Sequence, residues 1–174
     1  DPVMLETGGL HLEATLLAGQ KTGLYLDQLN TYDRIASLAP GKRVLDCFSN
    51  QGGFGLACAR AGAASVTCVD ISAEAIAAVR RNAELNDLKT ETVEANAFDY
   101  LKNCDEQFDL IILDPPSFTR SKKALRDAMR GYKEIHLRAL KLLDHDGYLA
   151  TFSCSHHVSR ELFLNNVRDA AVDT

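Results

Sequence analysis

The sequence predicts an α/β fold in which helices cover both faces of a mostly parallel sheet. Short apolar runs alternate with amphipathic stretches from residue 44 to residue 171, as in successive βαβ units. Such crossovers are right-handed, and open sheets of this kind bind ligands at the carboxyl ends of their strands. Carboxylates, glycines or an amide follow several of the apolar runs, so we expect the functional site at that edge.

The composition agrees with an ordinary globular domain. The 174 residues are 46% hydrophobic and 25% charged, and no apolar run is long enough to span a membrane. Five cysteines lack C-x-x-C spacing, which indicates reduced thiols in a cytoplasmic compartment. The chain begins with Asp1, and we expect it to be a piece of a longer protein.

An appendage precedes the sheet. Residues 3–17 alternate apolar and polar side chains around Gly8-Gly9, which predicts a β-hairpin. A polar loop over 19–28 leads to a helix over 30–39, which Pro40-Gly41 ends. We therefore divide the chain into a hairpin with a loop that faces the site, 1–28, and a main domain, 29–174.

The first core strand ends in a loop with paired glycines. Residues 43–47 read as a strand, 48–53 as a polar turn that contains Gly52 and Gly53, and 54–61 as an alanine-rich helix. Glycine permits a sharp bend and lets a ligand approach with no Cβ in the way, while the helix start offers free N–H groups. This stretch therefore predicts a ligand site.

The next strand ends in Asp70, about 20 positions beyond the glycine turn, where a carboxylate can bind both hydroxyls of a ribose. The ligand is therefore expected to be an adenosine. The nicotinamide fingerprint G-x-G-x-x-G is absent, and Asp46 would repel a pyrophosphate. Because Asp46 can face the amino group or sulfonium of S-adenosylmethionine (SAM), we favour SAM. The alternative is that Asp46 only braces the loop by accepting its N–H groups.

The third strand, expected over 91–95, ends in an amide. Ser72 reads as the N-cap of the helix that precedes this strand. Asn96 and Phe98 can bracket an adenine at the strand's end, although an asparagine in this position is more often a turn former.

Residues 108–113 read as a buried central strand that runs into Asp114-Pro115-Pro116-Ser117-Phe118. Two prolines hold the carboxylate rigidly, which suits a group aimed at a substrate base, with Phe118 available to stack on it. The alternative is a stiff strand exit that faces solvent.

A local basic patch follows, although the formal net charge is −5. Phosphate contact and an ordinary solvated helix face account for it equally well. Asp127 opposes six cations, which are Arg120, Lys122, Lys123, Arg126, Arg130 and Lys133.

A fifth strand is expected over 148–152, after a turn at Asp146-Gly147, and a helix over 159–171 closes the chain. The strand ends in Ser153-Cys154-Ser155, next to two histidines. Most cysteines in such positions are buried small hydrophobes, but the basic neighbourhood of Cys154 could support a thiolate.

Together these motifs resemble the bacterial 23S rRNA 5-methylcytosine methyltransferases of the RlmI type. The resemblance covers nearly the whole chain and implies a SAM-dependent, class I Rossmann-like fold, here truncated after the fifth strand. Its motifs are Lys21-Thr22-Gly23, Leu26-Asp27-Gln28, Asp46-Cys47-Phe48-Ser49, Gly52-Gly53-Phe54, Asp114-Pro115-Pro116, Arg130-Gly131-Tyr132-Lys133 and Phe152-Ser153-Cys154-Ser155.

The resemblance also implies a site. Cys154 would be the nucleophile that adds to C6 of a cytosine, and Asp114 would stabilise the proton at N3. The base that removes the C5 proton is not identified. By residue type alone, two of the implied cofactor ligands, Tyr25 and Gln28, are ordinary loop residues. The implied SAM ligands are Tyr25, Gln28, Asp46, Phe48, Ser49, Gly52, Gly53, Asp70, Ile71, Ser72, Asn96, Ala97 and Asp114.

The chain departs from the family pattern in several places. Leu29 replaces an arginine after Gln28, and Ser117 takes the place of the second cysteine that some RNA methyltransferases carry. By this resemblance, we expect the given sequence to lack the family's RNA-binding PUA domain and the last strands of its sheet. The implied partner is 23S rRNA, without a membrane, and the exposed edge of the fifth strand predicts a homodimer or aggregation.

Three other functions compete with this interpretation. An amino-methyltransferase would use the Asp-Pro-Pro-aromatic element to hold an exocyclic nitrogen, with Cys154 in a structural role. A binding-only module would hold SAM or RNA without turnover. An NAD oxidoreductase lacks both its fingerprint and recognisable hydride-transfer residues.

Overall fold

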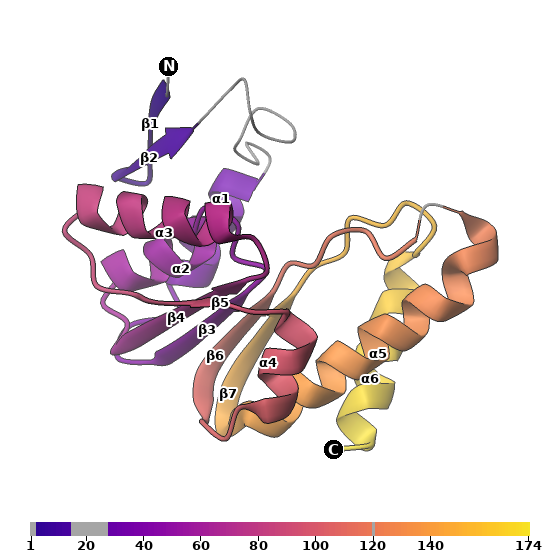
Figure 1. Cartoon of the computed structure of the whole chain (residues 1–174). Coiled ribbons are helices and arrows are strands. Elements are labelled where there is room, and N and C mark those ends of the chain that lie inside the picture. Colours follow the sequence, from indigo (N-terminus) through magenta and orange to yellow (C-terminus); the bar gives the residue numbers. More distant parts are fainter. Residues whose placement is uncertain (1–2, 15–27, 120) are drawn as a thin grey trace.

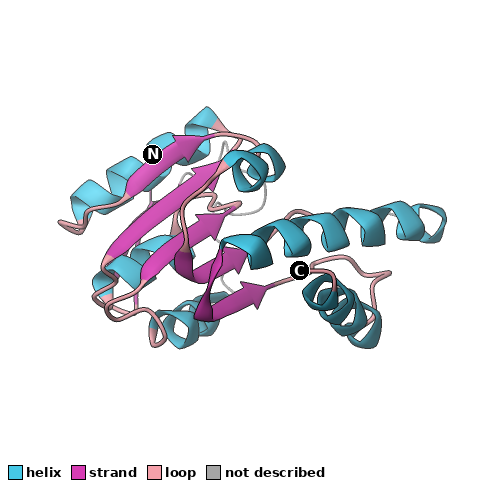
Figure 2. Cartoon of the chain, turned by 90° about the horizontal axis from the view of Figure 1, so that it is seen from below, coloured by secondary structure: helices cyan, strands magenta, loops and turns pink. Residues whose placement is uncertain are grey.

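The computed structural model describes residues 3–14, 28–119 and 121–174, and the predicted α/β fold is confirmed there (Figure 1). Residues 15–27, which include Tyr25, the end of the predicted 3–17 hairpin and most of the predicted 19–28 loop, lie outside the described residues, as does Arg120. Helices lie on both faces of the sheet, as Figure 2 shows from below. A five-stranded parallel sheet has the order β5-β4-β3-β6-β7, with β3 Arg43–Cys47, β4 Ser65–Asp70, β5 Glu91–Glu94, β6 Phe108–Leu113 and β7 Leu143–Thr151.

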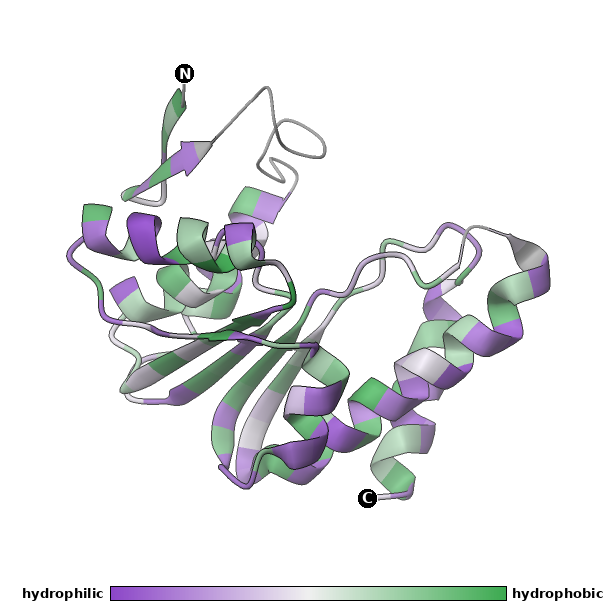
Figure 3. Ribbon diagram, in the orientation of Figure 1, coloured by the Kyte–Doolittle hydropathy of each residue, from purple (hydrophilic) through white to green (hydrophobic). Residues whose placement is uncertain are grey.

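The helices form where the sequence places amphipathic stretches, and polar and apolar residues alternate along α3 and α5 in Figure 3. Within the described residues, no helix is long and apolar enough to cross a membrane. The helices are α1 Leu29–Ala36, α2 Gly53–Arg60, α3 Ala73–Leu85, α4 Ala97–Asn103, α5 Leu125–Leu142 and α6 Arg160–Val172, with a short 3₁₀ turn, η2, at Lys122–Ala124.

Successive side chains of the central strands enter two separate cores. Val44 packs with Phe54 and Leu56 on the face that α1, α2 and α3 cover. Leu45, one residue on, packs with Ile135 on the face that α4 and α5 cover. This alternation follows from the two-residue period of a strand, and it explains why β6 is apolar along nearly its whole length.

The predicted hairpin is confirmed in the described residues, with β1 Val3–Thr7 antiparallel to β2 Leu10–Ala14. Asn82 of α3 and Asn86, the C-cap of that helix, hold it against the domain. Asn82 Oδ1 accepts from the Glu13 N–H (2.9 Å), and Asn86 exchanges two hydrogen bonds with the backbone of His11 (2.8 and 2.7 Å). Asn82 Nδ2 also donates to the Gln51 carbonyl oxygen, so the hairpin is joined to the glycine loop.

The fifth strand differs from the prediction. The sequence predicted a turn at Asp146-Gly147 before a strand over 148–152, but β7 begins at Leu143, directly after α5. The turn residues form an irregularity inside the strand, where the pairing with β6 changes register between Phe108 and Leu110. The Asp-Gly pair thus marks a local irregularity, but it does not interrupt the strand as predicted.

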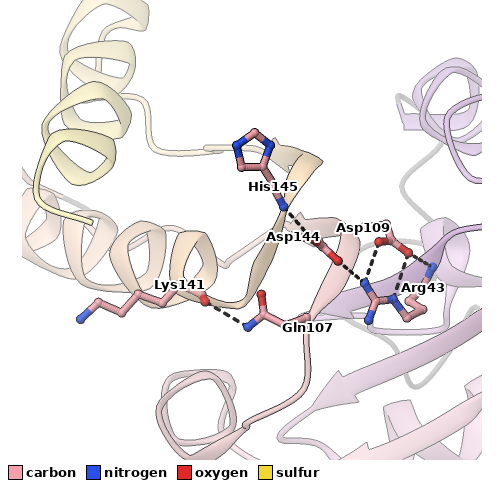
Figure 4. A network of polar contacts seen from close by, with 6 residues as sticks. All are labelled: Arg43, Gln107, Asp109, Lys141, Asp144 and His145. Carbon is pink, nitrogen blue, oxygen red and sulfur yellow. Dashed lines mark hydrogen bonds and ion pairs between the residues drawn. The ribbon is translucent and has the colours of Figure 1, made fainter.

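An ion-pair network at the amino-terminal edge of the sheet holds this irregularity (Figure 4). Arg43 Nη2 lies 2.8 Å from Asp109 Oδ1 and 2.6 Å from Asp144 Oδ2, so one guanidinium joins β3, β6 and β7. The hydrogen bonds from Arg43 lower the pKa of Asp109 to about 2. The three strands that carry the opposite, carboxyl-terminal edge are thereby fixed relative to one another.

Strand β7 is an edge of the sheet in the described residues, because no strand there pairs with its outer side. We predict that the chain self-associates through the 148–151 part of this edge, because unpaired backbone groups beside its uncharged side chains favour strand addition. Tyr148→Glu places a charge on a side chain that is 47% exposed and should reduce the association. Sedimentation velocity over a concentration series measures this, with exposed Leu85→Glu as the control; a concentration-independent monomer for the unmodified chain would contradict the prediction.

Candidate active site

The loop after β3 has a strained and closely packed backbone. Phe48 (φ 63°) and Asn50 (φ 48°) adopt left-handed conformations without being glycine, and Gly52 (φ 84°) caps α2. A Cβ at Gly53 would lie 2.5 Å from Cζ of Tyr32, which allows only glycine there. Strain of this kind persists only where the surroundings enforce it, and it concentrates at functional sites.

Asp46 lies beneath this loop and is 1% exposed. Its Oδ2 accepts from the Gly55 N–H (2.8 Å), so the bracing role is observed. Its Oδ1 is buried and has no hydrogen-bond partner in the described part of the chain. Burial raises the pKa of Asp46 to about 8; the Gly55 N–H opposes this shift, and the charges of Asp114 and Asp70 add to it. One oxygen of a buried acid therefore remains for a ligand.

Asp70 fixes the other side of the loop. Its Oδ2 accepts from the Asn50 N–H and its Oδ1 from the Ser72 N–H, both at 2.9 Å. Ser72 caps α3 by accepting from the Ala75 N–H (3.3 Å), as predicted, and the neighbouring Ile71 is 69% exposed. Each carboxylate oxygen of Asp70 has a further lone pair, so these contacts leave capacity for ligand hydroxyls.

Asn96 has the role of a turn former. Its Oδ1 accepts from the Phe98 N–H (2.9 Å) and caps α4, while Ala97 is buried. The bracketing of an adenine by Asn96 and Phe98 stays a prediction.

Four buried side-chain oxygens lack a hydrogen-bond partner in the described residues, and they share one edge of the sheet. They belong to Asp46, to Ser49 and Gln51 in the glycine loop, and to Gln28. Gln28 joins this group because its Nε2 donates to Asp114 Oδ2 (2.9 Å) at the end of β6. Leaving one buried polar atom unsatisfied costs about 1–3 kcal/mol, so a cluster indicates a ligand that supplies donors. Sequence reasoning had not singled out Gln51 for this role.

The Asp114-Pro115-Pro116 loop lies beside the loop that follows β7. The Ser117 and Ser155 hydroxyls are 3.0 Å apart, and the Phe152 N–H bonds the Leu113 carbonyl oxygen (2.9 Å). Both loops extend together beyond the ends of β6 and β7 (Figure 1). The half-buried ring of Phe118 packs against the ring of Tyr132, with 4.6 Å between the ring centroids, and its stacking on a base stays a prediction.

Cys154 stands apart from the other cysteines, because its residue is exposed while Cys47, Cys58 and Cys68 are buried. Burial raises the pKa of the Cys47 and Cys68 thiols well above the usual value and that of Cys58 to about 12, so these three are inert hydrophobic groups. The Cys154 Sγ lies 3.8 Å from the Pro115 carbonyl oxygen, next to Asp114. The thiol and the carboxylate thus share the strand edge, as predicted.

The basic patch is partly neutralised in the described residues. Lys133 Nζ lies 2.7 Å from Asp173 Oδ2, and Arg130 is 3.9 Å from Asp127. Lys123 and Arg126 line a groove of about 590 Å³ between α5 and α6. The patch therefore carries less free positive charge than its sequence indicates.

Comparisons with known proteins agree with this geometry. Two proteins named Ribosomal RNA large subunit methyltransferase I align with 99% of this chain and 45% of their own length: that of Aeromonas salmonicida (strain A449) at 41% identity over 179 residues, and that of Shewanella frigidimarina (strain NCIMB 400) at 42% over 178. The chain spans about half the length of these curated relatives.

Among solved structures, a putative methyltransferase complexed with SAH has a TM-score of 0.87 at 26% identity, over 97% of this chain and 46% of that one. A family model described as Conserved hypothetical protein 95 matches residues 28–157, which include every motif discussed above from Gln28 to Ser155. The resemblance found in the sequence is thus confirmed, and the chain belongs to the Conserved hypothetical protein 95 family.

Proposed function

We propose that this chain is the catalytic part of a SAM-dependent methyltransferase that modifies C5 of a cytosine in 23S rRNA. The observation that carries the proposal is the cluster of unpartnered buried oxygens around Asp46, which lies on the same sheet edge as the exposed Cys154. The names of the relatives support rRNA as the substrate, and the SAH in the related structure supports the cofactor.

The donor and acceptor balance of the site favours SAM over a dinucleotide. The unpartnered amide oxygens of Gln28 and Gln51 can only accept hydrogen bonds, and so can the unpartnered oxygen of Asp46 when this acid is ionised. These acceptors suit an ammonium group beside a sulfonium. Asp70 and Asp114 add negative charge that raises the pKa of Asp46 and would repel a pyrophosphate. Gln28 bonds Asp114, which supports the proposal that residues 1–28 contribute a loop facing the cofactor.

The residues of the β6 and β7 loops then have defined tasks. When bound, SAM supplies an activated methyl group at this edge. The Cys154 thiolate forms a bond to C6 of the cytosine, which shifts electron density to C5 and makes that carbon nucleophilic. Asp114 holds the proton that N3 acquires. Once C5 carries the methyl group, a base must remove the C5 proton, and the S–C6 bond then breaks so that the thiolate leaves.

Amino-methyl transfer is the second candidate. The carboxylate of Asp114 adjoins the carbonyl of Pro115, and such a pair could hold the two hydrogens of an exocyclic amino group. Cys154 would then be structural. Incubating the chain with SAM and protein-free rRNA, followed by nucleoside mass spectrometry, distinguishes the products; bound SAM without any methylated nucleoside would favour a binding-only module.

The thiol of Cys154 is the proposed nucleophile. Cys154→Ala should abolish methyl transfer and leave SAM affinity within about two-fold, because the thiol acts on the base and not on the cofactor. Cys104→Ala, at a half-buried cysteine, is the control and should keep its activity. Trapping on 5-fluorocytidine RNA should label Cys154 alone, whereas a fully active Cys154→Ala enzyme would support amino-methyl transfer.

Asp46 makes the stability of the cofactor-free chain depend on pH. Its pKa is about 8 in the fold against an ordinary 3.8, so the folded state keeps a proton that the unfolded state releases. The stability from this group is complete below about pH 4 and is lost as pH rises through about 8. Asp46→Asn keeps an acceptor for the Gly55 N–H. At pH 8 its free energy of unfolding should exceed that of the unmodified chain by on the order of 1–3 kcal/mol.

Urea unfolding at pH 5 and pH 8 measures this, with the larger gain expected at pH 8. Because an amide, unlike the carboxyl group of Asp46, cannot release a proton and face a cationic ligand as a carboxylate, SAM should bind at least about ten-fold more weakly in calorimetry. Equal pH slopes for the two proteins would show that Asp46 is ionised in the fold.

The ribose assignment is tested at Asp70. Asp70→Ala should weaken SAH binding by about ten-fold or more, although part of this loss comes from the released Asn50 and Ser72 N–H groups. An SAH analogue without the 2′-hydroxyl isolates the ribose contact. The unmodified chain should prefer SAH to the analogue, and Asp70→Ala should not; an unchanged preference would place the ribose elsewhere.

A further inference from the structure

A buried tyrosine of α5 holds both residues that flank Cys154. The Tyr132 hydroxyl lies 2.9 Å from Ser153 Oγ and 3.0 Å from Ser155 Oγ, and Tyr132 is 0% exposed. Since both serines turn toward one phenol in the core, the residue between them is presented outward, and Cys154 is exposed. Tyr132 has no role in the cofactor site or in the proposed chemistry.

The contacts continue into the other catalytic loop as a directed chain. Ser117 Oγ donates to the Thr119 carbonyl oxygen (2.8 Å), which can only accept. A hydroxyl has one proton, so Ser155 must donate to Ser117.

By the same reasoning, Tyr132 donates to Ser155, and Ser153 donates to Tyr132. Ser153 Oγ in turn accepts from the Ser155 N–H (3.3 Å). Every hydroxyl of the chain thus gives one hydrogen bond and receives one, and such chains strengthen cooperatively.

The ring of Tyr132 is fixed on several sides. It packs against Phe118, with 4.6 Å between centroids, and edge-on against Phe163, with 5.3 Å. The phenol oxygen therefore has little freedom, and the two loops bonded to it inherit its position. Cys154 lies between Ser153 and Ser155 of the hydroxyl network. Its Sγ contacts the Pro115 carbonyl oxygen at 3.8 Å, which brings it next to Asp114.

We infer that Tyr132 is a positioning residue for methyl transfer, which sets the Cys154 thiol relative to Asp114 through Ser153, Ser155 and Ser117. The inference rests on the proposed function, since it requires Cys154 to be the nucleophile. An uncharged network suits this task, because a buried charge next to the cysteine would alter the reactivity of its thiol.

Tyr132→Phe tests the inference, because it removes one oxygen and keeps the packed ring. The single-turnover rate of methyl transfer should fall by about ten-fold or more, while the affinities for SAM and for RNA stay within about three-fold. Tyr100→Phe makes the same change on α4, where the phenol is half-buried near Cys104, and should leave the rate unchanged.

A second variant separates positioning from general destabilisation. Ser155→Ala interrupts the same series of hydroxyl hydrogen bonds at its middle. The double variant Tyr132→Phe/Ser155→Ala should therefore transfer methyl groups no more slowly than the slower single variant. Rates are taken per SAM-binding site, so that unfolded protein does not contribute. Multiplying losses would indicate two separate structural effects and overturn the inference.

The outcomes also separate this inference from the proposed function. A Tyr132→Phe enzyme at full rate, in a chain that Cys154→Ala inactivates, overturns the positioning role alone. A Cys154→Ala enzyme that still transfers methyl groups overturns both. If the unmodified chain shows no transfer, hydrogen exchange of 114–119 and 152–156 decides: Tyr132→Phe should speed exchange in both loops together, and a change confined to 152–156 would contradict the inference.

Discussion

The hydrogen bond from the Gly55 N–H to the buried carboxylate of Asp46 is the contact on which the ligand edge depends. It joins the end of the central strand β3 to the first turn of α2, and it requires glycine at position 55. A Cβ there would lie 2.5 Å from Cys68 Sγ and 3.1 Å from Asp46 Oδ2. The helix can therefore approach the sheet closely enough for the loop between them to bend. Asp70 then fixes the loop from the neighbouring strand, so two carboxylates shape the cradle before any ligand arrives.

The two halves of the sheet edge are held by different chemistry. Carboxylates organise the loops after β3 and β4. Neutral hydroxyls join the loops after β6 and β7, where the Asp114 carboxylate bonds Gln28 instead. Negative charge is compatible with a cationic cofactor, and it is opposed to the formation of a thiolate. The use of serine and tyrosine hydroxyls around Cys154 keeps that loop ordered without adding charge. The division follows the proposed roles of the two halves.

Most of the fold could be predicted from the sequence because its signals are local. Hydrophobic periodicity and glycine loops place β3, α2 and β4 within a few residues, and the N-caps at Ser72 and Asn96 have the geometry that their residue types favour. The extension of β7 to Leu143 could not be predicted. It depends on Arg43, which is about 100 residues from Asp144 in the chain, and Asp-Gly ordinarily indicates a turn.

The candidate site shows the same limit. Residue type and strand order were enough to gather Asp46, Asp70, Asp114 and Cys154 at one edge, because parallel strands end together. They could not identify Tyr132 as a contact of Ser153 and Ser155, since its position in a helix indicates only a core aromatic. They also gave no sign that Phe118 packs against Tyr132 of α5. Long-range side-chain contacts, unlike backbone order, leave no periodic signal in a sequence.

The unpartnered oxygens indicate what this arrangement costs and how a ligand offsets it. Four buried atoms lack a partner among residues 3–14, 28–119 and 121–174, and at about 1–3 kcal/mol each they are a large fraction of the 5–15 kcal/mol by which domains are stable. A ligand at 100 times its dissociation constant returns only about 2.7 kcal/mol. The fold of the cofactor-free chain must therefore be stabilised by its two cores and by the Arg43 network. The Arg43 network lies at the opposite edge of the sheet from the unsatisfied oxygens. A cradle that stays formed without its ligand binds with little further loss of conformational entropy. Rigid support beneath the site is thus the condition under which unsatisfied groups can be kept ready for a cofactor.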